Sequence, residues 1–110
     1  MQVTQERFED AGERDADGCC DYYYSGVIYR FRFPTRVLVA RRYDDTIGEA
    51  SFLRPESASG DTLAIFAEIP YREPEFCQAV AYLRNSEGVE LVQVLLSGGY
   101  VQIDFRELAA

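Results

Sequence analysis

Alternating apolar and polar residues mark the segment from residue 21 to residue 33. The apolar set consists of Val27, Tyr29, Phe31 and Phe33. A period of two, with aromatic and β-branched residues, predicts a strand. Pro34 and Thr35 interrupt this pattern before a second predicted strand at residues 36–43. The two strands are therefore expected to form a hairpin.

Two further strands are predicted at residues 49–54 and 62–69, separated by the loop of residues 55–60. Residues 44–48 join the first of them to the preceding hairpin and contain Asp and Gly, which suit a turn. The strand at residues 62–69 is expected to place one alternating set on a single face, namely Leu63, Ile65, Ala67 and Ile69. A helix is the alternative for this segment, but it would be short.

One helix is predicted to begin at residues 73–75 and to run to about Arg84. Pro74 suits the first helical position, and the flanking glutamates complement the positive end of the helix dipole. Phe76, Val80 and Leu83 recur at helical spacing and form an apolar stripe. Residues 85–88 end the helix.

The last segments, residues 89–96 and 100–105, predict a second hairpin around residues 97–99. The first is apolar on nearly both faces, which is typical of a central strand covered from both sides. The second alternates cleanly, as an edge strand does. The sequence therefore predicts an α+β fold, with one helix packed on a twisted, mainly antiparallel sheet of about six strands in the order β-β-β-β-α-β-β.

Charge divides the chain into two parts. Residues 1–21 carry seven acids and two Arg, which is -5 of the net charge of -8. We interpret residues 1–20 as an acidic, solvated N-terminal arm and residues 21–110 as a globular domain. The alternatives are that the arm competes with nucleic acid for a basic partner, or folds back over the Arg-rich strands of its own body.

The residue inventory narrows the chemistry. The chain contains no His, and its eleven basic residues are all Arg. It therefore lacks the usual general base near neutral pH and the lysine of Schiff-base or phosphate sites. No apolar run is long enough to cross a bilayer, and no basic-then-apolar leader precedes the domain. The odd set Cys19, Cys20 and Cys77 favours a reducing cytoplasm.

Several candidate sites are better explained as ordinary structure. Adjacent Cys19 and Cys20 lack the spacing of a redox pair, and neither they nor Cys77 make a metal site without His. The turn acids Asp44, Asp45 and Glu49 lack the periodicity of a calcium loop. A carboxylate pair such as Glu68 and Asp104 carries no weight among 19 acids. We therefore expect no cofactor and no metal.

Arg30 and Arg32 alternate with aromatic residues, as in some surfaces that hold single-stranded nucleic acid. Alternation, however, puts the rings on one face and the guanidinium groups on the other. The acidic arm would also repel a polyanion. We therefore expect an aromatic core face and no direct binding of nucleic acid.

Residues 22–24 are three consecutive tyrosines, which cannot all face one core, so at least one is expected to be exposed. Tyrosine offers a large contact area at low conformational cost and is common at interfaces. Exposed carboxylates and tyrosines are together the candidate partner-binding residues: Glu6, Glu9, Asp10, Glu13, Tyr22, Tyr23, Tyr24, Asp44 and Asp45.

These observations favour a small, acidic, non-enzymatic protein that acts by binding another protein, itself basic or nucleic-acid-binding. In size and charge the chain is similar to bacterial or phage proteins that neutralise a toxin, a nuclease or a defence complex. The alternative is a domain that binds a small ligand or forms a homo-oligomer, such as a homodimer. An enzyme limited to carboxylates, Tyr, Cys and Arg is a third class, and no motif supports it.

Overall fold

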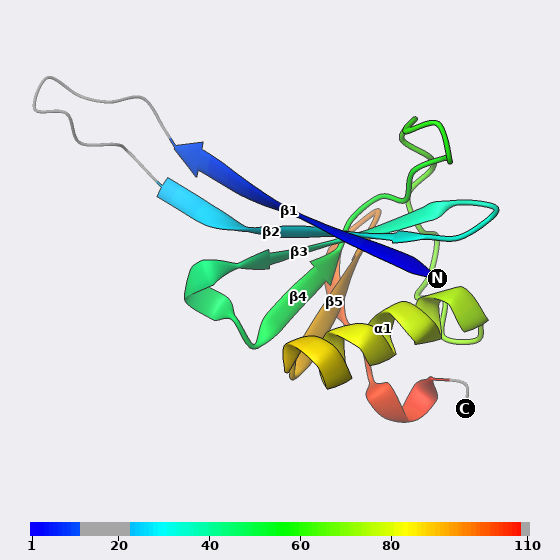
Figure 1. Cartoon of the computed structure of the whole chain (residues 1–110). Helices are drawn as coiled ribbons and strands as arrows, with labels where there is room; N and C mark the ends of the chain where they lie inside the picture. Colours follow the sequence, from blue (N-terminus) through cyan, green and yellow to red (C-terminus); the bar gives the residue numbers. More distant parts are fainter. Residues whose placement is uncertain (12–22, 109–110) are drawn as a thin grey trace, which may run out of the picture.

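Six strands lie side by side in the order β1-β2-β3-β4-β5-β6, with one α-helix against the sheet (Figure 1). The computed structural model describes residues 1–11 and 23–108. The predicted α+β fold with a mostly antiparallel sheet is confirmed. The elements are β1 (Gln2–Ala11), β2 (Tyr23–Arg32), β3 (Val37–Tyr43), η1 (Asp44–Thr46), β4 (Glu49–Phe52), α1 (Pro74–Glu87), β5 (Leu91–Leu96), β6 (Gly99–Gln102) and η2 (Phe105–Glu107).

Antiparallel pairing joins every pair of neighbouring strands except β4 and β5, which are parallel. Helix α1 lies in the long connection between these two, as a parallel pair requires. The predicted hairpin of β2 and β3 and that of β5 and β6 are both confirmed. Strand β5 lies inside the sheet, between β4 and β6, but it is not covered from both sides as predicted: Val92 and Val94 are buried, whereas Leu91 and Leu95 are only half-buried.

The core lies between one face of the sheet and α1 (Figure 1). Tyr29 and Phe31 of β2 are fully buried and both contact Tyr82 of α1, so the predicted aromatic face of β2 is its helix face. Phe52 of β4 packs on Phe76 of α1, with ring centroids 5.0 Å apart. The helix begins at Pro74 as predicted and ends at Glu87, three residues later than expected.

Strand β1 was not predicted. Its ten residues pair with β2 from Gln2 opposite Arg32 to Ala11 opposite Tyr23, so this part of the segment is not a solvated arm. The pairing agrees with the alternative that the arm folds back over an Arg-rich strand. The strand contributes little to the core beyond Val3, which is why its sequence shows no apolar period. Residues 12–20 of the expected arm, with Cys19 and Cys20, lie outside the described residues.

The strand predicted at residues 62–69 was wrong. This segment forms only isolated bridges, from Thr62 to Glu56 and from Phe66 to Leu96. Short backbone bonds fold the chain back on itself before it, including one from Leu63 N–H to the Pro55 carbonyl at 2.8 Å. Phe66 is the one buried residue of the segment; of the predicted inward set, Ile69 packs partly against the core and Ala67 is exposed.

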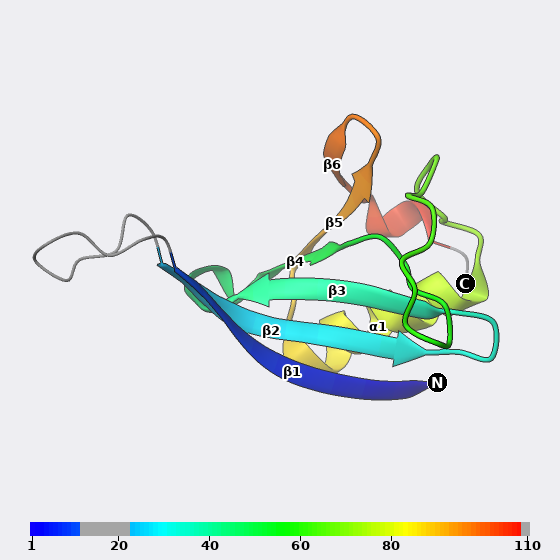
Figure 2. The same ribbon diagram turned by 90° about the horizontal axis from the view of Figure 1, so that it is seen from above.

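Only one face of the sheet is covered by α1; we call the other the open face. Strand register assigns alternate residues to each face. Gln5 of β1 lies opposite Tyr29 and therefore on the helix face, whereas Glu6 lies opposite Ile28 on the open face. Viewed from above, β1 forms the outer border of the sheet along its whole length (Figure 2).

Candidate partner-binding surface

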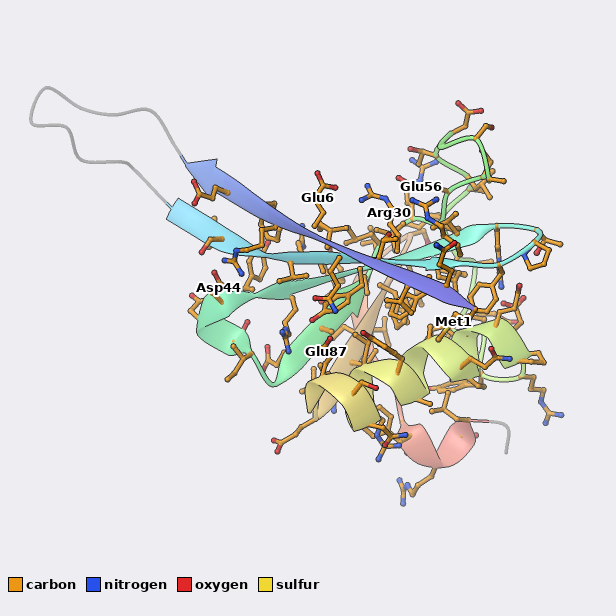
Figure 3. All side chains as sticks on the ribbon, viewed as in Figure 1. Met1, Glu6, Arg30, Asp44, Glu56 and Glu87 are labelled. Carbon is orange, nitrogen blue, oxygen red and sulfur yellow. The ribbon has the colours of Figure 1, made fainter. Side chains whose placement is uncertain are left out.

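The described candidate residues gather at the border formed by β1, the first residues of β2, and η1. We call the exposed carboxylates Glu6, Glu9, Asp44 and Asp45 the acidic border. They lie on both sides of the sheet. Glu6 projects from the open face, while Asp44 lies beyond the opposite face, near the end of β3 (Figure 3). Glu9 lies opposite Ser25 and so belongs to the helix face.

Glu6 belongs to an ion-paired row on the open face with Arg30 and Glu56. Arg30 Nη1 lies 3.1 Å from Glu6 Oε2, and Arg30 Nε lies 3.1 Å from Glu56 Oε1 (Figure 3). The hydrogen bond to Glu56 is the main reason that the pKa of Arg30 is raised. The Glu6 side chain is 70% exposed and that of Glu56 only 22%. Two carboxylates share one guanidinium, so the row keeps a negative charge, and Glu6 presents it to solvent.

Asp44 is held by two donors from neighbouring strands. Arg7 of β1 forms a salt bridge with it, and the Ser25 hydroxyl donates to its Oδ2 at 2.7 Å. The Arg7 hydrogen bond, with help from Ser25, lowers the pKa of Asp44 below its ordinary value. Arg7 is therefore engaged by a carboxylate. Asp45, the next residue, is exposed.

An aromatic cluster lies on the open face beside these acids. The Tyr43 ring contacts Phe8 at 5.9 Å and Tyr24 at 5.5 Å between centroids. Gly26 lies between them, and a Cβ there would stand 2.9 Å from the Phe8 ring and 2.1 Å from the Arg42 carbonyl oxygen. A side chain at this position would therefore displace the ring or the strand. Only glycine allows the rings to close over β2.

Tyr24 meets the expectation that at least one of the three tyrosines is exposed, at 45%. The cluster extends through Arg41, whose guanidinium lies 4.8 Å from the Tyr43 ring centroid and donates to the Tyr100 hydroxyl at 3.0 Å. Tyr100 is itself 43% exposed. The open face thus combines rings and guanidinium groups next to the acidic border.

The remaining candidates are placed in part or not at all. Asp10 and Tyr23 belong to the paired backbone of β1 and β2, and only their backbone is described. Glu13 and Tyr22 lie outside the described residues. Sequence reasoning missed Phe8, Tyr43 and Arg41. These residues come together only through the register of β1, β2 and β3 around Gly26, which the sequence alone does not reveal.

The described residues give no support to the metal, thiol and carboxylate-pair sites. No three His, Cys, Asp or Glu residues there come together as metal ligands. The Cys77 thiol donates to the Tyr71 carbonyl at 3.2 Å. Asp104 is bound by Arg106, which lowers its pKa, while Glu68 is exposed on a separate loop. Asp104 and Glu68 therefore show no sign of acting as a pair.

A polar network on the helix face has a structural role. Glu87, at the end of α1, accepts hydrogen bonds from Gln5 at 2.9 Å and from the Tyr82 hydroxyl at 3.3 Å. Arg42 donates to the Glu87 carbonyl at 3.2 Å. These contacts fasten the end of α1 to β1 and β3.

No protein-family model and no curated protein matches this chain, and no solved structure matches its fold. Across residues 1–11 and 23–108, no helix has the length and apolar character to span a membrane.

Proposed function

We propose that this protein binds a basic protein partner through its acidic border and thereby neutralises it, as a non-enzymatic inhibitor of the kind that acts on a toxin, a nuclease or a defence complex. The observation that carries the proposal is the arrangement of the border. Acids separated by up to 39 positions in the sequence, from Glu6 to Asp45, are brought to one exposed margin.

Electrostatics supports a basic partner. Arg7 and Arg30, which lie among these acids, are already bound to Asp44 and to the pair of Glu6 and Glu56. The net charge of -8 adds a long-range field of the same sign. A negative surface of this kind speeds the encounter with a positive partner and excludes acidic ones.

The aromatic cluster supports a protein rather than a small ion as the partner. Tyr24 is exposed at the acidic border, where it lies opposite Asp10, and exposed tyrosines next to charged groups are typical of protein interfaces. The rings are fixed by Gly26 and by Arg41, so little conformational entropy would be lost when a partner covers them.

The test is affinity capture from a lysate of the native host, followed by binding of the purified partner. The border variant carries Glu6→Arg and Glu9→Arg. The matched control carries Glu68→Arg and Glu90→Arg, which change the net charge equally at exposed glutamates of other segments. The border variant is expected to bind the partner at least about tenfold more weakly than the control, with a steeper loss at low salt.

Both variants should unfold at nearly the temperature of the parent, because all four residues are exposed and the Glu6–Arg30 pair lost from the border variant lies at the surface, where an ion pair contributes little. Equal binding by the border variant and the control would refute the acidic-border function. If both variants lose affinity for the partner to the same degree, the effect comes from net charge alone, and the role of the border is refuted as well.

A further inference from the structure

The outer edge of β1 is the longest free strand edge among the described residues. Strand β1 pairs with β2 on one side, and no described segment lies along the other (Figure 2). Alternate backbone N–H and C=O groups of a border strand point away from the sheet and accept another strand readily. Its ten residues span about 34 Å at the usual rise per residue. The opposite border, β6, has only four residues.

The side chains of β1 give this edge a readable pattern. On the open face a neighbouring strand would meet Thr4, Glu6 and Phe8; on the helix face it would meet Gln5, Arg7 and Glu9. Arg7 is bound to Asp44, so carboxylates dominate the charge that the edge offers. Phe8 is half-buried and still presents part of its ring.

A second copy of the chain is a poor occupant of the edge. Strand β1 contains three acids and one Arg, so two paired copies would bring together two segments of charge -2. Each copy also carries -8 in all. Like charges on adjacent strands are destabilising, whereas a basic strand would gain from the same field.

We infer that the partner inserts a basic, extended segment as an added strand along the outer edge of β1. On the open face, a basic residue of this segment lies against Glu6, and an apolar or aromatic residue two positions away lies against Phe8. This inference rests on the proposed function and specifies how the acidic border is used. Main-chain hydrogen bonds give the affinity of such a complex, and the alternate side chains give its specificity.

The structure favours this mode because β1 is already held in place. It pairs with β2 along its whole length, and Gln5 ties it to Tyr82 and Glu87 of α1. Only the incoming segment would lose conformational freedom on binding. A preformed strand therefore lowers the entropic cost of association.

The probe is a short acetylated and amidated peptide, Thr-Thr-Arg-Thr-Phe-Thr-Arg-Thr-Thr. Its pattern is symmetric, so Arg and Phe share one face in either strand direction. Titration into the ¹⁵N-labelled full chain should shift the amide signals of β1, and hydrogen exchange of the outward β1 amides should slow. A peptide with Phe moved one position, to the opposite face, is expected to bind at least about threefold more weakly.

Backbone pairing is separated from charge by N-methylation. The same peptide with every internal amide methylated keeps its side chains and charges but cannot pair as a strand. It is expected to bind at least about tenfold more weakly. Equal binding of the methylated peptide would overturn the added strand and leave the acidic border in place. The proposed function fails separately, if the partner binds the border variant as well as its control.

A pair of protein variants tests the edge itself. Successive backbone N–H groups of a strand point to opposite edges of that strand. Proline lacks this group, so one of Thr4→Pro and Gln5→Pro removes an N–H that points to the free edge, and the other removes a hydrogen bond to β2. We call the first the outward variant. The outward variant should keep the β1–β2 exchange protection and lose peptide binding. Undiminished binding by both variants overturns the proposal. The proposal is also overturned if sedimentation shows a concentration-dependent dimer that the outward variant abolishes, because the edge would then bind a second copy of the chain.

Discussion

Strand β2 runs through two different environments. Between Val27 and Arg32 it lies between β1 and β3 and against α1, with Tyr29 and Phe31 fully buried. Between Tyr23 and Ser25 it pairs with β1 alone, because the last β2–β3 pair is Gly26 with Tyr43. One half of the strand is core, and the other half belongs to a projecting two-stranded ribbon.

The forces that hold these halves differ as well. The covered half is stabilised by burial of large rings, which is a strong and nondirectional effect. The projecting half is held by ring contacts at the surface and by the Arg7–Asp44–Ser25 hydrogen bonds. Such exposed interactions contribute little each. Changes in the projecting half should therefore alter binding with small effects on folding.

The largest effect is expected in the core between the sheet and α1, which covers this half of β2. Phe76→Ala removes a fully buried ring that packs on Phe52 and should lower the free energy of unfolding by about 3 to 5 kcal/mol. Urea denaturation measures this change. Gln78→Ala, on the exposed side of the same helix, is the control and should have little effect. A loss below about 1 kcal/mol for Phe76→Ala would contradict the stabilisation assigned to buried rings in this core.

The junction of the two halves should be the next most sensitive position. In Gly26→Ala the new methyl group would overlap the Arg42 carbonyl, and overpacking of this kind costs about 1 to 3 kcal/mol. The Phe8 and Tyr43 rings should also separate, which near-ultraviolet circular dichroism detects. Gly98→Ala has open space around its Cβ and is the control. Unchanged aromatic signals in Gly26→Ala would show that the cluster does not depend on this glycine.

Within the covered half of β2, one buried polar atom lowers the free energy of unfolding. The Tyr29 hydroxyl is buried without a hydrogen-bond partner in the described part of the chain, and burial raises the pKa of Tyr29. Tyr29→Phe should therefore raise the free energy of unfolding by about 1 kcal/mol. Tyr82→Phe removes a hydroxyl that does bond to Glu87 and should lower it. Calorimetry that finds Tyr29→Phe destabilised by as much as Tyr82→Phe would reverse this interpretation.

The smallest effect on stability is expected at Asp44 and should depend on pH. Its folded-state pKa lies below the ordinary value of 3.8, because Arg7 and Ser25 donate to the charged form. The stabilisation is therefore fully present well above pH 3.8 and is lost as the pH falls through the lower, folded-state value. Asp44→Asn should be slightly less stable at neutral pH and should lose less stability on acidification.

Acid titrations of thermal unfolding would check this prediction. Asp45→Asn, which removes the same charge one residue further on and keeps the Arg7 pair, should titrate like the parent protein. Parallel acid profiles for Asp44→Asn and the parent would contradict the assigned ion pair.

Apolar periodicity was enough to predict β2, β3, α1, β5 and the fold class, because these elements bury one regular face. It failed for β1, which is ordered by backbone pairing and by the polar contacts of Gln5 and Arg7. It also failed at residues 62–69, where backbone bonds such as that from Leu63 N–H to the Pro55 carbonyl hold the chain in a loop and Phe66 is the one buried residue. Both errors arise where tertiary contacts override the local pattern.

The candidate site was predictable in composition and not in arrangement. Exposed acids and tyrosines could be named from the sequence, and Glu6, Glu9, Tyr24, Asp44 and Asp45 do lie at the surface. Their grouping depends on β1 lying beside β2 in one particular register. A shift of one residue would move Glu6 to the helix face. The ring cluster around Gly26 depends on the same register, so neither the acidic border nor the ring cluster follows from the sequence without the strand pairing.

The parallel pairing of β4 with β5 has a consequence for the order of folding. These strands are separated by residues 53–90, whereas β2, β3 and β4 follow one another through short links. Closing the longer loop costs more chain entropy before its contacts form, so this step should limit the refolding rate. In stopped-flow experiments, Val94→Ala, in β5, should refold more slowly than the parent protein. Val3→Ala, in β1, should mainly increase the unfolding rate. The time the chain needs to become competent for binding would then be set by strands at the far side of the sheet from β1.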